Sequence, residues 1–307
     1  MRLEELIQKR FVSTAALAER LTTYNGVPAV FSPEAPGDEQ DGWGGETQYP
    51  MVTYNYDLQA NEERNSAGSL SVSIFCQNTT DVFPEDIAPI VKECLRDVIL
   101  LPEGGTPYCF TWARTDAFTM GEDAGKAGVV IGCEVRFDIL EYPSMETSDP
   151  DPVMAVDKYI KELYPKCLVM GYDRMEEITE ASADQPVVYC RLISSEKQEE
   201  TNTVAWMDGR IAVHVLCPES TVRLKMAADI ANHLSLDGEV IMLDYSPMFI
   251  KRLQVNYKSD YLKEGQVFIT GHYGLLRYKA IMIVFPCCKY SSSTAVASCP
   301  PQHTFTR

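Results

Sequence analysis

Two nine-residue segments alternate apolar and polar side chains in the same way. They are residues 68–76, GSLSVSIFC, and residues 209–217, GRIAVHVLC. Both begin with glycine, end with cysteine and place apolar residues at every second position, as in a β-strand with one buried face. We expect Gly68 and Gly209 to serve the turn before each strand. The two glycines are 141 residues apart, a spacing that suits a repeated domain rather than a solenoid unit.

The surroundings of the two segments follow one order. A proline opens an earlier strand at Pro50 and at Pro186, and an alternating segment closes each copy at 129–140 and 266–278. Between these, apolar residues recur at helical spacing: Ile87, Ile90, Val91, Cys94, Leu95 and Val98 in the first copy, and Val222, Met226, Ala227, Ile230, Ala231 and Leu234 in the second. The order predicts an α+β fold with two tandem related domains, each a mainly antiparallel sheet with helices on one face. Two convergent strand–helix units are the alternative.

The same patterns divide the chain. We expect a first repeat over 1–145, an acidic, proline-bearing linker over 146–152, and a second repeat over 153–278. Residues 279–307 contain no Asp or Glu and are rich in Ser and Pro. This composition predicts a flexible C-terminal tail, which is either an arm that orders on a neighbour or sequence without a selected fold.

Composition excludes several classes of function. The 307 residues carry a formal net charge of −17, so phosphate backbones are repelled and tight nucleic-acid binding is not expected. The sequence has no apolar run of 18 residues and no apolar core of a signal peptide near Met1. We therefore expect no membrane partner and a location in the cytoplasm of the cell that makes the protein.

The sequence offers little catalytic chemistry. Seven of the ten cysteines lie in apolar patterns and are predicted to pack as small hydrophobic residues: Cys76, Cys94, Cys109, Cys133, Cys167, Cys190 and Cys217. Cys287, Cys288, Cys299 and His303 do not have the spacing of a zinc site. None of the four histidines accompanies a nucleophile motif, and glycine-rich phosphate loops are absent. We predict no enzyme activity, no catalytic residue, no metal and no cofactor.

A few residues are candidates for subunit contacts. Trp43 lies in a polar loop, where an exposed indole needs a covering surface; folding back onto its own domain is the alternative. The other candidates are glutamates in two polar segments expected at hairpin tips, Glu62, Glu63, Glu196, Glu199 and Glu200. Solubility is the alternative role for these charges.

A family resemblance follows from the N-terminal layout. Two short helical runs lead to residues 26–36, GVPAVFSPEAP, and then to the proline-led strand 49–54, YPMVTY; residues 183–189, ADQPVVY, echo the strand in the second copy without the proline-rich stretch. This layout resembles the tail-completion or tail-terminator proteins of bacteriophages and prophages. The likeness covers 1–142 and, more loosely, 153–278.

The resemblance implies a non-enzymatic virion protein that joins head and tail. Such proteins form a ring, typically six-fold, that caps the tail tube, so the implied partners are copies of itself and tail-tube or connector proteins. The implied location is the bacterial host cytoplasm and then the virion or tail particle. The double length leaves a ring of three chains or of six open. An enzyme with a site between the domains and a binding module for a small molecule or a protein remain rivals.

Overall fold

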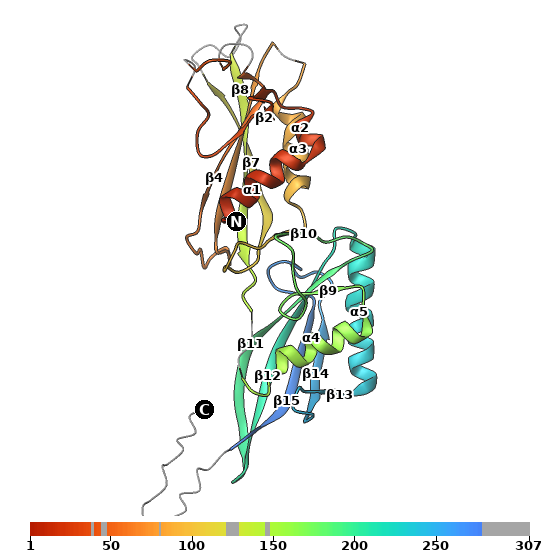
Figure 1. Cartoon of the computed structure of the whole chain (residues 1–307). Helices are drawn as coiled ribbons and strands as arrows, with labels where there is room; N and C mark the ends of the chain where they lie inside the picture. The colour runs from red at the N-terminus through yellow and green to blue at the C-terminus, as the bar shows by residue number, and fades with distance from the viewer. Residues whose placement is uncertain (38–39, 44–47, 80, 121–128, 145–147, 278–307) are drawn as a thin grey trace, which may run out of the picture.

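The chain folds into two sheet domains placed end to end (Figure 1). The computed structural model describes residues 1–37, 40–43, 48–79, 81–120, 129–144 and 148–277. Helices and mainly antiparallel strands occur in both domains, so the α+β prediction with two sheet domains is confirmed.

The first domain combines three helices with strands β1 to β8. The elements are α1 (Leu3–Ser13), α2 (Ala15–Ala18), β1 (Thr23–Tyr24), β2 (Val27–Pro28), β3 (Val30–Phe31), β4 (Met51–Asp57), β5 (Gly68–Gln77), α3 (Pro84–Leu95), β6 (Val98–Leu100), β7 (Tyr108–Met120) and β8 (Val130–Glu141). Its strands are ordered β6-β7-β8-β5-β4-β3, and only the β3–β4 pair is parallel.

The second domain repeats this arrangement. Its elements are α4 (Pro152–Leu163), β9 (Leu168–Val169), β10 (Ile178–Glu180), β11 (Val187–Glu200), β12 (Val204–Leu216), α5 (Ser220–Asp237), β13 (Glu239–Ile241), β14 (Pro247–Val255) and β15 (Val267–Leu276). Its sheet is ordered β13-β14-β15-β12-β11-β9, again with one parallel pair, β9–β11. Strand for strand, this is the order of the first sheet. The Asp151 carboxylate begins α4 by accepting hydrogen bonds from the first-turn amides of Val153 and Met154.

One strand crosses from the second domain into the first sheet. β10 pairs with β6 in antiparallel register, with Ile178 opposite Leu100 and Glu180 opposite Val98. The first sheet therefore has seven strands, β10 being its outermost. The domain limits along the sequence and the limits in space differ at this strand.

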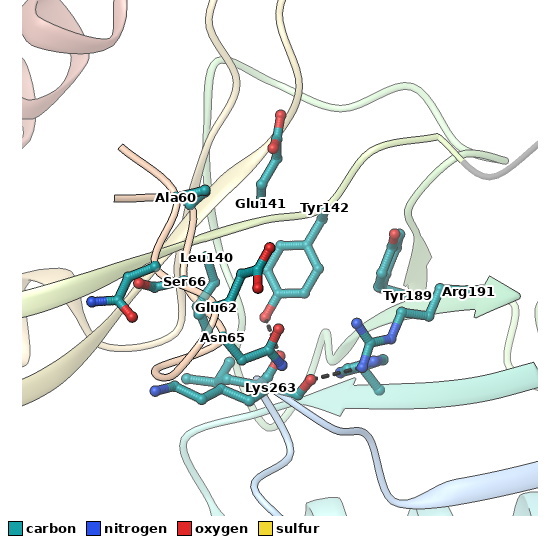
Figure 2. A pocket seen from close by; sticks show the side chains of 14 residues that line it. Ala60, Glu62, Asn65, Ser66, Leu140, Glu141, Tyr142, Tyr189, Arg191 and Lys263 are labelled. Atoms are coloured by element: carbon teal, nitrogen blue, oxygen red, sulfur yellow. Dashed lines mark hydrogen bonds between the residues drawn. The ribbon is translucent and has the colours of Figure 1, made fainter. Parts of the chain in front are cut away.

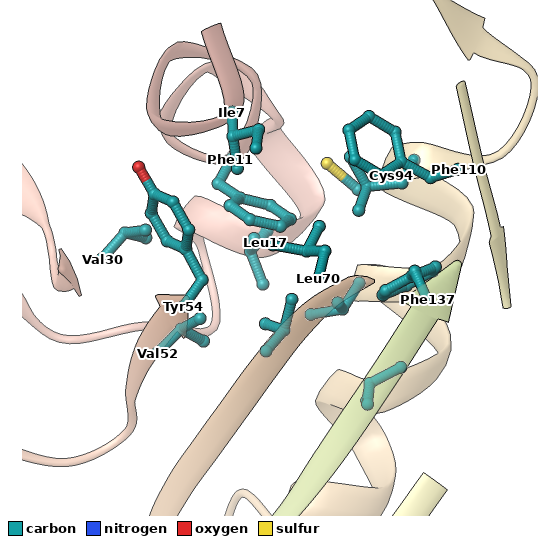
Figure 3. Close-up of a cluster of buried hydrophobic side chains, with 14 of the residues drawn as sticks. Ile7, Phe11, Leu17, Val30, Val52, Tyr54, Leu70, Cys94, Phe110 and Phe137 are labelled. Carbon is teal, nitrogen blue, oxygen red and sulfur yellow. The ribbon is translucent and has the colours of Figure 1, made fainter. Parts of the chain in front are cut away.

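The helices of each domain cover one face of its sheet and bury a separate core. In the first domain Phe11 of α1 packs near Tyr54 and Leu70 (Figure 3). Most residues of the two predicted helical stripes are buried, as expected from their spacing. Val98 is an exception to the predicted helix, because α3 ends at Leu95 and Val98 is the first residue of β6.

Close packing explains the glycines that begin the two repeated segments. Gly209 lies inside β12, opposite Gly271, so the predicted turn role is wrong there. A Cβ at this position would lie 3.1 Å from the ring of Tyr273. Gly68 begins β5, and a Cβ there would lie 2.2 Å from the Asp57 carbonyl oxygen. Both positions favour glycine because another group approaches the backbone.

Corresponding hairpins of the two domains point in the same direction along the molecule. The β4–β5 turn of the first domain meets the β14–β15 turn of the second, where the Lys263 ammonium donates to the Arg64 carbonyl at 3.0 Å. The other long hairpin of each domain, β7–β8 and β11–β12, therefore extends toward opposite ends of the molecule (Figure 1). Corresponding strands run along one line rather than facing each other across a two-fold axis.

Candidate functional site

A cavity of about 310 Å³ lies between the two domains (Figure 2). The β4–β5 turn contributes Glu62 and Asn65, the end of β8 contributes Tyr142, and the second domain contributes Arg191 and Lys263. The cavity exists because two turns and two strand ends meet without filling the space between them. It is the place where the rival enzyme or binding site is expected.

The cations beside this cavity already have partners within the chain. The buried Asp138 carboxylate accepts from the Arg64 Nε at 2.9 Å and from the Lys263 Nζ at 3.0 Å. The Arg191 guanidinium donates to the Lys263 carbonyl at 2.8 Å. These bonds join the β4–β5 turn, β8 and the β14–β15 turn. The charges therefore hold the domains together, since a buried carboxylate needs such partners.

A buried histidine sits in an aromatic cluster on the floor of the cavity. The ring of His214 lies 5.5 Å from that of Tyr189, which lies 4.8 Å from that of Tyr142. The His214 Nδ1 is 2.8 Å from the Tyr261 carbonyl, so this nitrogen is the donor in the neutral ring. Burial, with a smaller effect of the Arg191 charge, lowers the pKa of His214 to about 4. The imidazole is neutral at pH 7, so its one ring proton is held in the bond to the Tyr261 carbonyl and its Nε2 carries none.

A second polar cluster joins the two domains at the start of β6. The Tyr261 hydroxyl donates to the Asp97 Oδ1 at 2.9 Å, and the Arg223 guanidinium lies 3.9 Å from the centre of the Tyr261 ring. Arg96 donates to the Pro218 carbonyl at 3.0 Å. Burial raises the pKa of Asp97. These contacts link the end of α3 to the β14–β15 turn and the start of α5.

The apolar part of the contact forms a core of its own. Ile99 and Leu140 of the first domain pack with Met170, Val187 and Leu216 of the second. All five side chains are buried. The domains are therefore joined by a hydrophobic interior with polar clusters beside it, which is typical of a stable interface.

A smaller cavity of about 200 Å³ borders the same contact and has a buried carboxylate in its lining. Asp157 of α4 faces it near Tyr189 and Cys190. Burial raises the pKa of Asp157 to about 7, and its Oδ1 has no hydrogen-bond partner among the described residues. Burial also raises the pKa of the Cys190 thiol, which disfavours the thiolate that a cysteine nucleophile needs.

Trp43, the first contact candidate, is buried in its own domain. Its side chain is 4% exposed, and its ring lies 5.2 Å from that of Tyr24 and 5.1 Å from that of Phe31. This is the folded-back alternative of the sequence analysis. In this conformation the indole is closed to a neighbouring subunit.

The glutamate candidates occupy two distant places. Glu62 lines the cavity between the domains and Glu63 lies exposed on the same turn. Glu196, Glu199 and Glu200 are exposed in the outer half of β11. The predicted hairpin tip is wrong for these three, because strand pairing continues as far as Glu200 opposite Ala205. Glu200 forms ion pairs with Lys197 and Arg277.

The cysteines behave as the sequence predicts. The seven in apolar patterns are buried and free of disulfides. Cys287, Cys288, Cys299 and His303 fall outside the described residues. Within the described part, no group of three or more His, Cys, Asp or Glu side chains could hold a metal ion. The helices described here are all too short or too polar to cross a membrane.

Sequence reasoning missed the residues that join the domains. Asp97 and Tyr261 are far apart along the chain, and no spacing pattern connects them. One signal was available: residues 97–101, DVILL, and residues 239–243, EVIML, are near copies of each other. The first copy forms the edge strand β6 at the contact, and the second forms β13.

Neither a protein-family model nor a curated protein matches this chain. Its function is therefore inferred from the geometry of the two domains and from the contact between them.

Proposed function

We propose that this chain is a non-enzymatic structural protein of a phage or prophage, acting as a tail terminator, tail-completion or head–tail joining component by ring assembly. The observation that carries the proposal is the stacking of two sheets of identical strand order in one direction. When two similar domains join through different ends, each added domain leaves the same kind of end free. The same contact can therefore be repeated by further copies.

The proposal includes an ancestral duplication. The two sheets share strand order, position of the parallel pair and order of helices. The repeated segments 68–76 and 209–217 lie in β5 and β12. Each of these strands pairs with the last strand of its domain, β8 or β15. Copies of one domain inherit the same two end surfaces, so a contact within the chain has counterparts between chains. Three chains would then give a ring of six domains; alternatively, six chains would each place one domain in the ring and the other outside it.

The charge and the N-terminal resemblance support the phage assignment. A net charge of −17 suits a ring whose lumen passes DNA without binding it, since like charges repel. The layout of residues 26–36 and 49–54 resembles that of tail-completion proteins. Partners would be further copies of the chain and tail-tube or connector proteins. The protein would act first in the bacterial host cytoplasm and then in the particle.

The contact between the domains favours a structural role over catalysis. The cations at the cavity bind carboxylate or carbonyl oxygens of the same chain, and His214 is neutral. A binding module is the second candidate, because the His214 Nε2 is buried near the cavity without a hydrogen-bond partner among the described residues. A thermal-shift screen with small hydrogen-bond donors tests this candidate; no stabilisation by any of them would remove it.

Electron microscopy of the purified full chain tests the ring. We expect closed particles with a central hole and three or six chains each. DNA binding at low salt is a second readout, and we expect none. A chain that stays monomeric at every concentration, or that binds DNA tightly, would contradict the proposal.

A further inference from the structure

The edge strand β6 of the first domain is completed by the second domain. Ala181 donates its amide to the Asp97 carbonyl at 3.0 Å, and Leu101 donates its amide to the Glu177 carbonyl at 2.8 Å. Backbone groups of alternate residues point to the same side of a strand. The odd-numbered residues 97, 99 and 101 therefore face β10. The side chain of Ile99 is fully buried in the interface core.

β13 repeats this strand in the second domain. Val98 and Leu100 belong to the first core, and Val240 and Met242 belong to the second. This places Ile241 where the first domain has Ile99, in agreement with the sequence match of 97–101 to 239–243. Each strand also pairs antiparallel with the strand that follows it, β7 or β14.

The outer edge of β13 is open in the described part of the chain. Ile250 donates to the Gly238 carbonyl and Met242 donates to the Ser246 carbonyl, both at 2.9 Å. The even-numbered residues therefore face β14. The backbone groups of 239, 241 and 243 face outward, and no described strand pairs with them. In Figure 1 β13 is the outermost strand of the lower sheet.

Apolar side chains are exposed along this open edge. Ile241 is 45% exposed and Leu243 is 50% exposed, and Tyr245 in the turn after them is 85% exposed. Phe249, opposite Glu239 on β14, is also exposed. A free strand edge with exposed apolar residues attracts another strand unless the fold protects it. Here the fold supplies no charged side chain at the central position, 241.

We propose that the outer edge of β13 accepts a strand from a second copy of this chain. Its equivalent, β6, is covered by β10, a strand of a domain with the same strand order, so a strand of a second copy of the chain is the occupant with matching backbone chemistry. Strand addition of this kind supplies backbone hydrogen bonds for affinity and apolar pockets for specificity. The inference rests on the proposed function, because it names the surface through which the chains join.

The test compares two lysine variants of the full chain. Ile241→Lys places a charge on the edge, a change that edge strands tolerate. Leu58→Lys, in the β4–β5 turn, is the matched control, since Leu58 is exposed to a similar degree. Sedimentation over a concentration series measures assembly, and urea unfolding followed by circular dichroism checks that each variant folds. We expect Ile241→Lys to weaken assembly at least about tenfold and Leu58→Lys to leave it unchanged.

Hydrogen exchange supplies the second readout. The amides of Ile241 and Leu243 should exchange quickly in dilute wild-type protein and slowly in the assembled state. Equal assembly of Ile241→Lys and wild type would overturn the inference while leaving ring formation intact. Loss of small, open oligomers in Ile241→Lys would support the edge contact even if no ring forms.

Two other results would also overturn the inference. The first is slow exchange of these amides in the monomer that becomes fast when the chain is shortened to end at Arg277, which would mean that the chain's own C-terminal residues occupy the edge. The second is a monomer at every concentration, which would overturn the proposed function as well.

Discussion

The two sheet domains cover the same apolar end in different ways. In the first domain Met51 pairs with Phe75, and Trp43 of the same domain packs over this end of the sheet. In the second domain the equivalent pair is Val187 with Leu216, and here the first domain provides the cover. One domain thus closes its end with its own loop, and the other closes it with a neighbouring domain.

The difference arises between corresponding strands. The stretch between β3 and β4 brings Trp43 back onto its own domain. The stretch between β9 and β11 instead brings β10 across to the first sheet. The same place in the fold therefore serves either self-closure or attachment. In the described conformation the first domain's equivalent end is closed by Trp43, so attachment of a further domain there requires the stretch between β3 and β4 to open.

Removing the self-closing side chain should have the largest effect. We expect Trp43→Ala to destabilise the first domain by about 3 kcal/mol, because a large buried ring is lost from a packed cluster. Urea unfolding followed by circular dichroism measures this. Trp112→Ala is the control, since Trp112 is largely exposed, and we expect a loss below about 1 kcal/mol. Equal effects of the two changes would contradict the assignment of Trp43 to a buried cluster.

Acid should remove the stability that the neutral His214 ring contributes at the contact between the domains. The pKa of His214 is about 4 in the folded chain, below the ordinary 6.5, so the unfolded state binds the proton more readily. The stability from the neutral ring is present above pH 6.5 and is lost as pH falls toward 4. Between pH 6.5 and 5 the contribution of His214 falls by about 2 kcal/mol. Over the same range Asp157, whose pKa burial raises to about 7, changes the stability in the opposite direction.

The variant His214→Asn should lack the His214 contribution to the pH profile of stability, because an asparagine amide can still donate to the Tyr261 carbonyl and does not titrate. His233→Asn, at an exposed position on α5, should leave the profile unchanged. A profile of the same slope in wild type and His214→Asn would show that His214 does not cause the acid sensitivity.

The hydrogen bond between Tyr261 and Asp97 should contribute a smaller amount to the free energy of unfolding. We expect Tyr261→Phe to cost about 1–2 kcal/mol, since it leaves the buried Asp97 carboxylate without its hydroxyl donor. Tyr257→Phe, on the same turn but exposed, is the matched control and should have no measurable effect. Urea midpoints of the two variants measure the difference, and identical midpoints would contradict the proposed importance of the Asp97 bond.

A substitution in the outer part of the β11–β12 hairpin should have the smallest effect on stability. Glu200 is exposed, and its hydrogen bond to Lys197 and the charge of Arg277 lower its pKa. Exposed ion pairs contribute little to stability. We expect Glu200→Gln to leave the urea midpoint unchanged, measured at low and at high salt. A clear loss at low salt alone would reveal a stronger network at this hairpin than its exposure suggests.

The sequence predicts the regular parts of this fold well. Alternation in 68–76 and 209–217, and the helical stripes after them, follow directly from burying one face of a strand or helix. β10 could not be predicted in this way, because three residues carry no periodicity and their partner lies in another domain. The predicted turn at Gly209 is wrong because the close approach of the Tyr273 ring, rather than a turn, favours glycine there.

The residues predicted to make contacts also show what the sequence alone does not determine. Trp43 was rightly singled out as a ring in need of cover, but sequence does not say whether its own domain or a neighbour covers it. The bonds of Asp138 and of Asp97 join residues more than 70 positions apart. Only the repeat of 97–101 in 239–243 could have pointed to the edge strands.

A mixing experiment tests the joining of unlike ends most directly. A labelled Ile241→Lys chain has one blocked end and one intact end, so added to the wild-type protein it should enter the assemblies and terminate them as smaller, open species. Sedimentation with detection of the label measures both the incorporation and the size. Exclusion of the labelled variant from all wild-type assemblies would contradict the account, because it would mean that two β13 edges pair with each other across a two-fold axis.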